Sequence, residues 1–111
     1  MILKWHNFTE QLRNLDKTAI YEILNLMVLR GVTEVNLTNN DDEYDDVYAY
    51  CFDDDGHSAD NILIKTAKME INNGVSYLTL VDDEGIEHST MDFHEGTFPY
   101  IYNAVFNKLR A

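Results

Sequence analysis

The sequence predicts one α+β domain spanning residues 1–111, with an N-terminal helix, an antiparallel meander of about five strands and a C-terminal helix. Three observations carry this prediction. Apolar residues recur at helical spacing near both ends of the chain, the runs between them alternate in polarity, and the turns that join these runs are too short for parallel strands. We expect both helices to pack on one face of the sheet.

The N-terminal helix is predicted over residues 16–31, the longest apolar stretch of the chain. Asp16 is expected to cap its start, because a short carboxylate accepts the free N–H groups of a first helical turn. Gly31 is expected to end it in a left-handed conformation. Leu26 and Leu29 widen the apolar stripe, so that the helix is expected to be buried on two sides. The stripe itself consists of Ala19, Ile20, Ile23, Leu24, Met27 and Val28.

Five strands are expected from the alternating runs that follow this helix. They cover residues 33–38, 47–52, 61–71, 75–81 and 86–93. The run 47–52 is apolar on both faces, which is typical of a strand that is covered on both sides. Asn73-Gly74 is the strongest local signal in the chain, because both residues tolerate the positive φ angles of a two-residue hairpin turn.

The C-terminal helix is expected over residues 98–109. Thr97 is a suitable N-cap, and Pro99 fits the first turn, where its missing N–H breaks no helical hydrogen bond. Lys108 suits the last turn, since a cation complements the helix dipole. The stripe expected to be buried consists of Phe98, Ile101, Ala104, Val105 and Leu109.

Charge is distributed unevenly along the chain. The formal net charge is −12, and residues 31–64 contain ten acidic side chains but neither Lys nor Arg. Their mutual repulsion destabilises the compact state, and a cationic partner would relieve it. The alternative is an ordinary solvated acidic surface. Direct binding to nucleic acid is not expected, because the phosphates would be repelled.

A cytoplasmic location without a membrane span is expected. The first residues turn polar too soon for a secretory signal, and the single Cys51 allows no internal disulfide. The longest apolar stretch is shorter than the ~20 residues that cross a bilayer, and it carries Glu22 and Asn25.

The acidic residues are expected to form two rims along the sheet and to bind a partner. In a meander, alternate turns lie at the same end, and loops two strands apart are separated by ~10 Å, so their potentials add. The rim expected to share its end with the turn at residues 72–74 consists of Asp41, Asp42, Glu43, Asp45 and Asp46. The opposite rim consists of Asp53, Asp54, Asp55, Asp60, Asp82, Asp83 and Glu84.

Tyrosines are the second group of predicted partner-binding residues. With the helices on one face of the sheet, Tyr48, Tyr50 and Tyr77 are expected on the open face. Exposed tyrosines suit protein interfaces, because they combine a large contact area with a hydroxyl group. The alternative is that these rings only shield the sheet. Their expected neighbours on that face are Thr66, Lys68, Thr79 and His88.

Motifs for catalysis or metal binding do not fit the sequence. An EF-hand loop counted back from Gly56 would begin at Cys51, which is not an acidic ligand. His88, Asp92 and His94 match no specific zinc spacing. Cys51 lies between two aromatic residues, which predicts a buried and inert thiol. Because nucleophile-elbow and phosphate-loop motifs are also absent, we expect no enzyme activity, no catalytic residue, no metal and no cofactor.

Three functions remain compatible with these features. The first is a small acidic module that occupies a basic surface of a partner protein, such as a nucleic-acid-binding or toxin surface, as an inhibitor or immunity-type protein. The second is a self-associating structural module, a homodimer formed through the open sheet face or an edge strand. The third is a binder of a divalent cation or small ligand at the acidic turns. The charge distribution places the first ahead.

Overall fold

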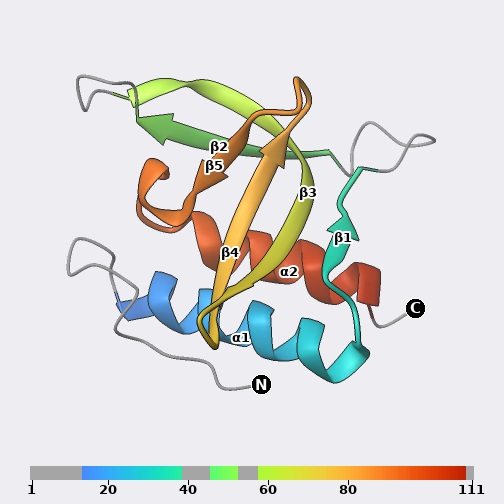
Figure 1. The fold of residues 1–111 in the computed structure, drawn as a ribbon. Coiled ribbons are helices and arrows are strands. Elements are labelled where there is room, and N and C mark those ends of the chain that lie inside the picture. The colour runs from blue at the N-terminus through green and yellow to red at the C-terminus, as the bar shows by residue number, and fades with distance from the viewer. Residues whose placement is uncertain (1–13, 39–45, 53–57, 110–111) are drawn as a thin grey trace.

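Two helices lie side by side beneath one face of a five-stranded antiparallel sheet in the computed structural model (Figure 1). This arrangement confirms the predicted fold class. The structure describes residues 14–38, 46–52 and 58–109. The elements in chain order are α1 (Asn14–Arg30), β1 (Glu34–Asn36), β2 (Val47–Phe52), β3 (Ser58–Asn72), β4 (Val75–Asp82), β5 (Glu87–Ser89), the 3₁₀ turn η3 (Thr90–Asp92) and α2 (Thr97–Leu109). The helices contact each other, α1 contacts β4, and α2 contacts β1 and β2.

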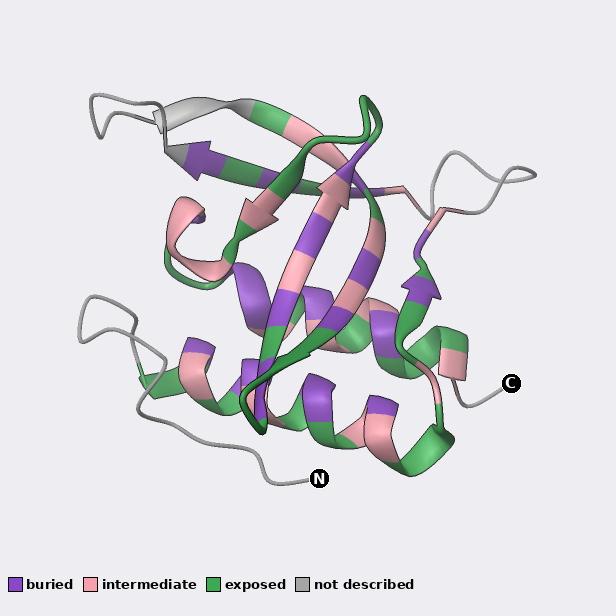
Figure 2. Cartoon of the chain, in the orientation of Figure 1, coloured by how far each residue is buried: buried purple, intermediate pink, exposed green. Residues whose placement is uncertain are grey.

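The buried face of α1 follows the predicted apolar stripe, and Figure 2 shows the buried positions of both helices on the sides that face the sheet. The hydrophobic core of α1 consists of Ala19, Ile20, Ile23, Leu24 and Met27. Gly31 ends the helix with a φ of 68° and donates its N–H to the carbonyl of Val28 (3.1 Å). Val32 donates to the carbonyl of Met27 (3.0 Å), which completes a Schellman motif. The expected widening of the buried stripe holds at Leu26, which packs partly buried against the core, and was wrong at Leu29, which is 73% exposed. The helix contacts both α2 and β4.

Strand β3 organises the sheet because it is long enough to pair with two short strands on one edge. β2 pairs with its first half, from Phe52 opposite Ser58 to Val47 opposite Ile64, and β1 pairs with residues 66–68. β4 pairs along the other edge of β3, and β5 pairs with β4. Strands β2 to β5 therefore form the expected meander, while β1 lies beside β3 and not beside β2.

This register decides which turns lie near each other. Val47, at the start of β2, and Asp82, at the end of β4, both pair with Ile64, so they flank the same point of β3. The turn at residues 73–74 lies at the far end of β3, beyond the part that β1 covers. Placing Asp46 at the end of the sheet that carries this turn was therefore wrong, because β1 occupies the edge of β3 on that side.

The turn between β3 and β4 confirms the Asn-Gly prediction. Asn73 and Gly74 have φ angles of 54° and 78°, and they join two strands that pair up to the turn. The last strand is shorter than the expected range of residues 86–93. β5 ends at Ser89, whose N–H donates to the carboxyl group of Asp92 (2.9 Å), and the chain continues as η3.

Asp16 connects the first turn of α1 to the start of α2. Its side chain is 1% exposed, and its two carboxyl oxygens accept the backbone N–H groups of Gly96 (3.0 Å) and Phe98 (3.1 Å). The expectation that Asp16 caps its own helix was wrong. Its acidic group instead complements the dipole of α2 and supplies an acceptor that the sequence assigned to Thr97.

Candidate protein-binding site

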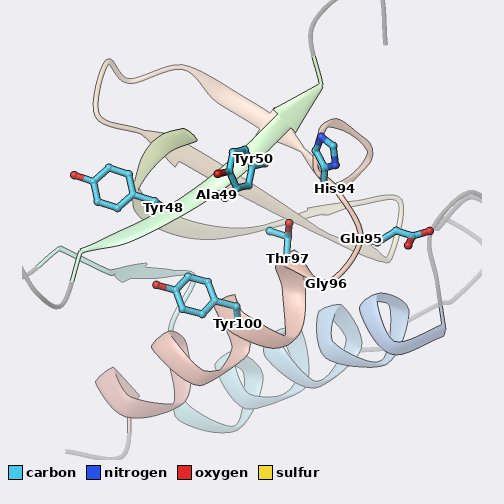
Figure 3. Close-up of a pocket in the computed structure, with 8 residues that line it drawn as sticks. All are labelled: Tyr48, Ala49, Tyr50, His94, Glu95, Gly96, Thr97 and Tyr100. Atoms are coloured by element: carbon cyan, nitrogen blue, oxygen red, sulfur yellow. The ribbon is translucent and has the colours of Figure 1, made fainter. Parts of the chain in front are cut away.

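A pocket of about 200 Å³ lies between the outer edge of β2 and the start of α2 (Figure 3). Figure 3 shows Tyr48 and Tyr100 projecting to the same side, Thr97 at the start of the helix below Tyr50, and Glu95 pointing away from the tyrosines. The pocket is lined by Tyr48, Ala49, Tyr50, His94, Glu95, Gly96, Thr97 and Tyr100. It thus joins two segments that are more than forty residues apart in the chain.

The alternation of β2 places two tyrosines at this pocket. Val47, Ala49 and Cys51 are buried, whereas Tyr48 and Tyr50 on the other face are 50% and 54% exposed. Strand side chains point alternately to opposite faces, so burial of one set exposes the other. Tyr100, from the first turns of α2, is 49% exposed. Three half-exposed tyrosines therefore surround one pocket.

The segment after η3 closes part of the outer edge of β2. Phe93 forms an antiparallel bridge with Cys51, and the His94 N–H donates to the Tyr50 carbonyl (3.2 Å). The rings of His94 and Tyr50 meet edge to face with their centroids 6.1 Å apart. Gly96, at a φ of 84°, then turns the chain away into α2. The short ladder on this edge therefore stops at Tyr50.

The next position of this edge, Tyr48, is open toward the pocket. Successive peptide groups of a strand face opposite edges, so Tyr48 presents its N–H and C=O on the same edge as Tyr50. Leu63, which lies opposite Tyr48 on β3, supports this orientation. Its carbonyl accepts the Asp83 N–H on the far side of β3, so the backbone groups of Leu63 point away from β2 and those of Tyr48 point away from β3. Within the described ranges, no backbone group pairs with Tyr48 on its outer edge.

Tyr77 is not part of this surface. It lies opposite Glu70 on β3, whereas Tyr48 lies opposite Leu63, so about 23 Å of strand separates them. Tyr77 instead lines a second pocket, of about 320 Å³, together with Thr79 of β4 and the start of η3.

The remaining open-face residues are arranged largely as expected. Lys68 contacts Glu87 across the sheet (2.9 Å) and Glu70 along β3 (3.6 Å). Its hydrogen bond to Glu87, together with the charge of that carboxylate, raises the pKa of Lys68. His88 was wrongly assigned to this face, because it pairs with Leu80 and turns toward the core.

The predicted acidic residues fall into three groups. Asp83 and Glu84 are exposed in the β4–β5 turn, and Asp46 is half-buried beside the start of β2. Asp82 is buried, so its assignment to the partner-binding rim was wrong. The others lie outside the described residues: Asp41, Asp42, Glu43, Asp45, Asp53, Asp54, Asp55 and, for its side chain, Asp60.

Asp82 holds the β4–β5 turn together. One carboxyl oxygen accepts the N–H groups of Glu84 (2.9 Å) and Ile86 (2.9 Å), and the other contacts the Nε2 atom of His88 (2.8 Å). Burial acts to raise the pKa of Asp82, but the bond to His88 and the two backbone N–H bonds outweigh it. The pKa is therefore held below its ordinary value of 3.8.

Replacing Asp82 with Asn is expected to lower the free energy of unfolding by about 1–2 kcal/mol at neutral pH and by less in acid. A carboxyl group with a lowered folded-state pKa stabilises the protein fully above its ordinary value of 3.8, and this contribution is lost as the pH falls through the lower folded-state value. Urea unfolding of both proteins from about pH 7 to about pH 2 measures the difference.

Asp83→Asn is the matched control, because Asp83 is the exposed neighbour of Asp82 in the same turn. Acid also relieves repulsion among the surface carboxylates, which changes the stability of every variant. The informative quantity is therefore the difference in the free energy of unfolding between each variant and the wild type at each pH. If the loss of unfolding free energy caused by Asp82→Asn stays constant as the pH falls to about 2, the ionised carboxyl group of Asp82 does not stabilise the turn as assigned.

The single cysteine is buried, as predicted. Burial, followed by the charges of Asp92 and Asp82, raises the pKa of Cys51 to about 11. A thiol with this pKa is a poor nucleophile at neutral pH. Among the residues with described side chains, no three His, Cys, Asp or Glu residues converge as a metal site.

Sequence reasoning missed the half of the pocket that comes from residues 94–100. The spacing of the buried stripe in α2 indicates that Tyr100 lies off the core face, and this was the available signal. That Tyr100 meets β2 depends on the packing of α2 beneath that strand.

Comparisons with protein-family models, with curated proteins and with solved structures found no match for this chain. In the described part of the chain, no helix combines the length and apolar character needed to cross a membrane.

Proposed function

We propose that this protein is a small acidic protein-binding module that occupies a basic surface of a partner protein, in the manner of an inhibitor or an immunity-type protein. The observation that carries the proposal is the charge distribution. The ten acidic residues between positions 31 and 64 have no Lys or Arg among them. A basic partner would replace their mutual repulsion with attraction and would speed the encounter.

Internal pairing leaves this charge largely unbalanced. The chain has 20 acidic and 8 basic residues, so at least twelve carboxyl groups lack a basic residue of their own, even if every base pairs with one acid. The contacts of Lys68 illustrate the shortage, because one ammonium group serves both Glu87 and Glu70. Such a surface favours binding to cationic proteins over neutral ones.

The half-exposed tyrosines support an interface in the same region. Tyr48 and Tyr50 belong to β2, which lies inside the segment that carries the ten acids. Aromatic residues supply much of the binding energy at protein interfaces, whereas exposed charges mainly set specificity and association rate. A surface that combines both suits a specific partner.

The affinity for the natural partner is expected to fall at least tenfold between about 0.05 M and about 0.5 M salt. Partners would be captured from a native lysate on the immobilised full chain, identified by mass spectrometry and purified. Their dissociation constants would then be measured at both salt concentrations by surface plasmon resonance.

The triple variant Asp53→Asn/Asp54→Asn/Asp55→Asn is expected to bind more weakly at low salt and to show a shallower salt dependence. Glu22→Gln is the control, because Glu22 is an exposed acid of α1 outside the acidic segment. Partners whose affinity is unaffected by salt, or a triple variant that binds as Glu22→Gln does, would refute the proposal.

A further inference from the structure

We infer that the open edge of β2 at Tyr48, together with the pocket formed by Tyr48, Tyr50 and Tyr100, binds an extended Lys- or Arg-rich segment of the partner. The segment pairs with β2 as an added strand and places one basic side chain against the tyrosine rings. This inference rests on the proposed function and names the binding mode and the chemistry of the partner.

The first support is an interrupted ladder on the outer edge of β2. The chain itself begins this ladder with the Phe93–Cys51 bridge and the bond from His94 to Tyr50. Continued in antiparallel register, it would bring Gly96 opposite Tyr48. Gly96 instead donates its N–H to Asp16 (3.0 Å) and turns into α2. The helix cap therefore holds residues 96–97 away from Tyr48, and in the part of the chain that the structure describes no other backbone takes this strand-pairing position.

The second support is the position of the pocket beside that open edge. Alternate side chains of an added strand point to the same face, so every second residue can reach the tyrosines. Tyr48 and Tyr100 project to the same side of the pocket in Figure 3. A Lys or Arg head group over such rings gains a cation–π interaction, and its aliphatic stem covers their apolar surface.

The third support is charge, which selects the occupant. Residues 41–55, which include β2, contain eight acidic residues and no Lys or Arg. An added strand that is basic meets these charges favourably. A second copy of this chain would pair its own β2, from the same acid-rich stretch of sequence, with this edge, so pairing of β2 with β2 is disfavoured. Strand addition to an exposed edge is an established mode of peptide recognition.

The experiment uses capped synthetic peptides of about ten residues, the length of a long strand, against the full chain. The basic peptide alternates Lys and Thr, and the acidic peptide alternates Glu and Thr. Two further forms of the basic peptide are N-methylated at every second residue, in the two alternative frames, which removes the N–H groups of one edge without changing the charge. Binding is measured by calorimetry, and amide chemical shifts report the site.

The basic peptide is expected to bind and to shift the amides of residues 47–50 and 94–97, while the acidic peptide does not bind. At least one N-methylated frame is expected to bind about tenfold more weakly, because its strand pairing is blocked. Tyr48→Ala is expected to lose about tenfold in affinity, whereas Tyr48→Phe keeps it within about threefold, because the aromatic face remains.

Phe106→Ala is the matched control, because Phe106 is an exposed aromatic residue of α2 that does not line the pocket. Thermal unfolding of each variant checks that the fold is intact. The basic peptide could bind in a salt-sensitive way and yet bind Tyr48→Ala as tightly as the unchanged protein, with both N-methylated forms binding as tightly as the unmethylated peptide. That result would overturn the docking mode and leave the proposed function standing. Equal binding of the acidic peptide would overturn both, and a dimer formed through β2 would overturn the inference.

Discussion

Replacing Asp16 with alanine is expected to lower the free energy of unfolding by about 2–4 kcal/mol. The side chain is 1% exposed, and both of its oxygens accept backbone N–H groups at the start of α2. Alanine leaves the N–H of Phe98 without its acceptor in a buried site and that of Gly96 without its acceptor in a partly buried one. It also removes an acidic group from the positive end of the helix dipole. Urea denaturation at neutral pH, analysed by linear extrapolation, measures the loss.

Two further variants separate this role from an effect of charge alone. Asp16→Asn keeps one carbonyl oxygen as an acceptor, so its loss is expected to be smaller than that of Asp16→Ala. Glu22→Ala removes an acidic residue from an exposed position of α1, and it is expected to change stability by less than ~0.5 kcal/mol. An Asp16→Ala protein as stable as Glu22→Ala would show that the bonds to Gly96 and Phe98 contribute nothing.

Asp16 also shows which contacts a local sequence signal cannot predict. A short acidic residue before an apolar run indicates a helix cap, but the signal does not say which helix is capped. The partners of Asp16 lie 80 and 82 residues away, so they follow from tertiary packing. By contrast, the left-handed helix end at Gly31 and the hairpin at Asn73-Gly74 depend on neighbouring residues, and both were predicted correctly.

The strands show the same division between local and long-range information. A short apolar run located β2, and alternation located β4, almost to the residue, because each pattern depends only on residues within the strand. Alternation does not reveal that β3 is 15 residues long and pairs with both β1 and β2 on one edge. The predicted ends of the sheet were wrong at Asp46 for this reason, since each strand was assumed to pair along its full length with the next.

The candidate site was therefore predictable only in part. Tyr48 and Tyr50 were identified from the expectation that the helices cover one sheet face, and their exposure follows from the burial of Ala49 between them. The cover on both sides that the apolar run 47–52 indicated was wrong, because these two tyrosines are 50% and 54% exposed. Tyr77 has the same pattern, but the register places it far along the sheet. Tyr100 enters the pocket through the packing of α2 beneath β2, which no spacing within α2 encodes.

Replacing Phe98 with alanine is expected to cost about 3–5 kcal/mol, the largest loss anticipated for a single side chain. Phe98 is 0% exposed, and its ring meets that of Phe93 edge to face, with the centroids 5.8 Å apart. Phe93 contacts the ring of His88 in the same way at 5.8 Å. Alanine removes these contacts and leaves a cavity where the start of α2 meets the segment after η3. The midpoint and slope of urea denaturation give the loss.

Phe106→Ala controls for the loss of an aromatic ring from α2. Phe106 is 39% exposed, so its replacement is expected to cost less than ~1.5 kcal/mol. If the Phe98→Ala protein is as stable as Phe106→Ala, the ring of Phe98 does not contribute to the core as its burial indicates. The double variant with Asp16→Ala is expected to lose less than the sum of the single losses, because Asp16 bonds to the N–H of Phe98 itself. Such coupling would mean that one carboxyl group and one ring together hold residues 94–98 against α1 and the sheet. The wall of the tyrosine pocket would then be fixed by the core before any partner binds.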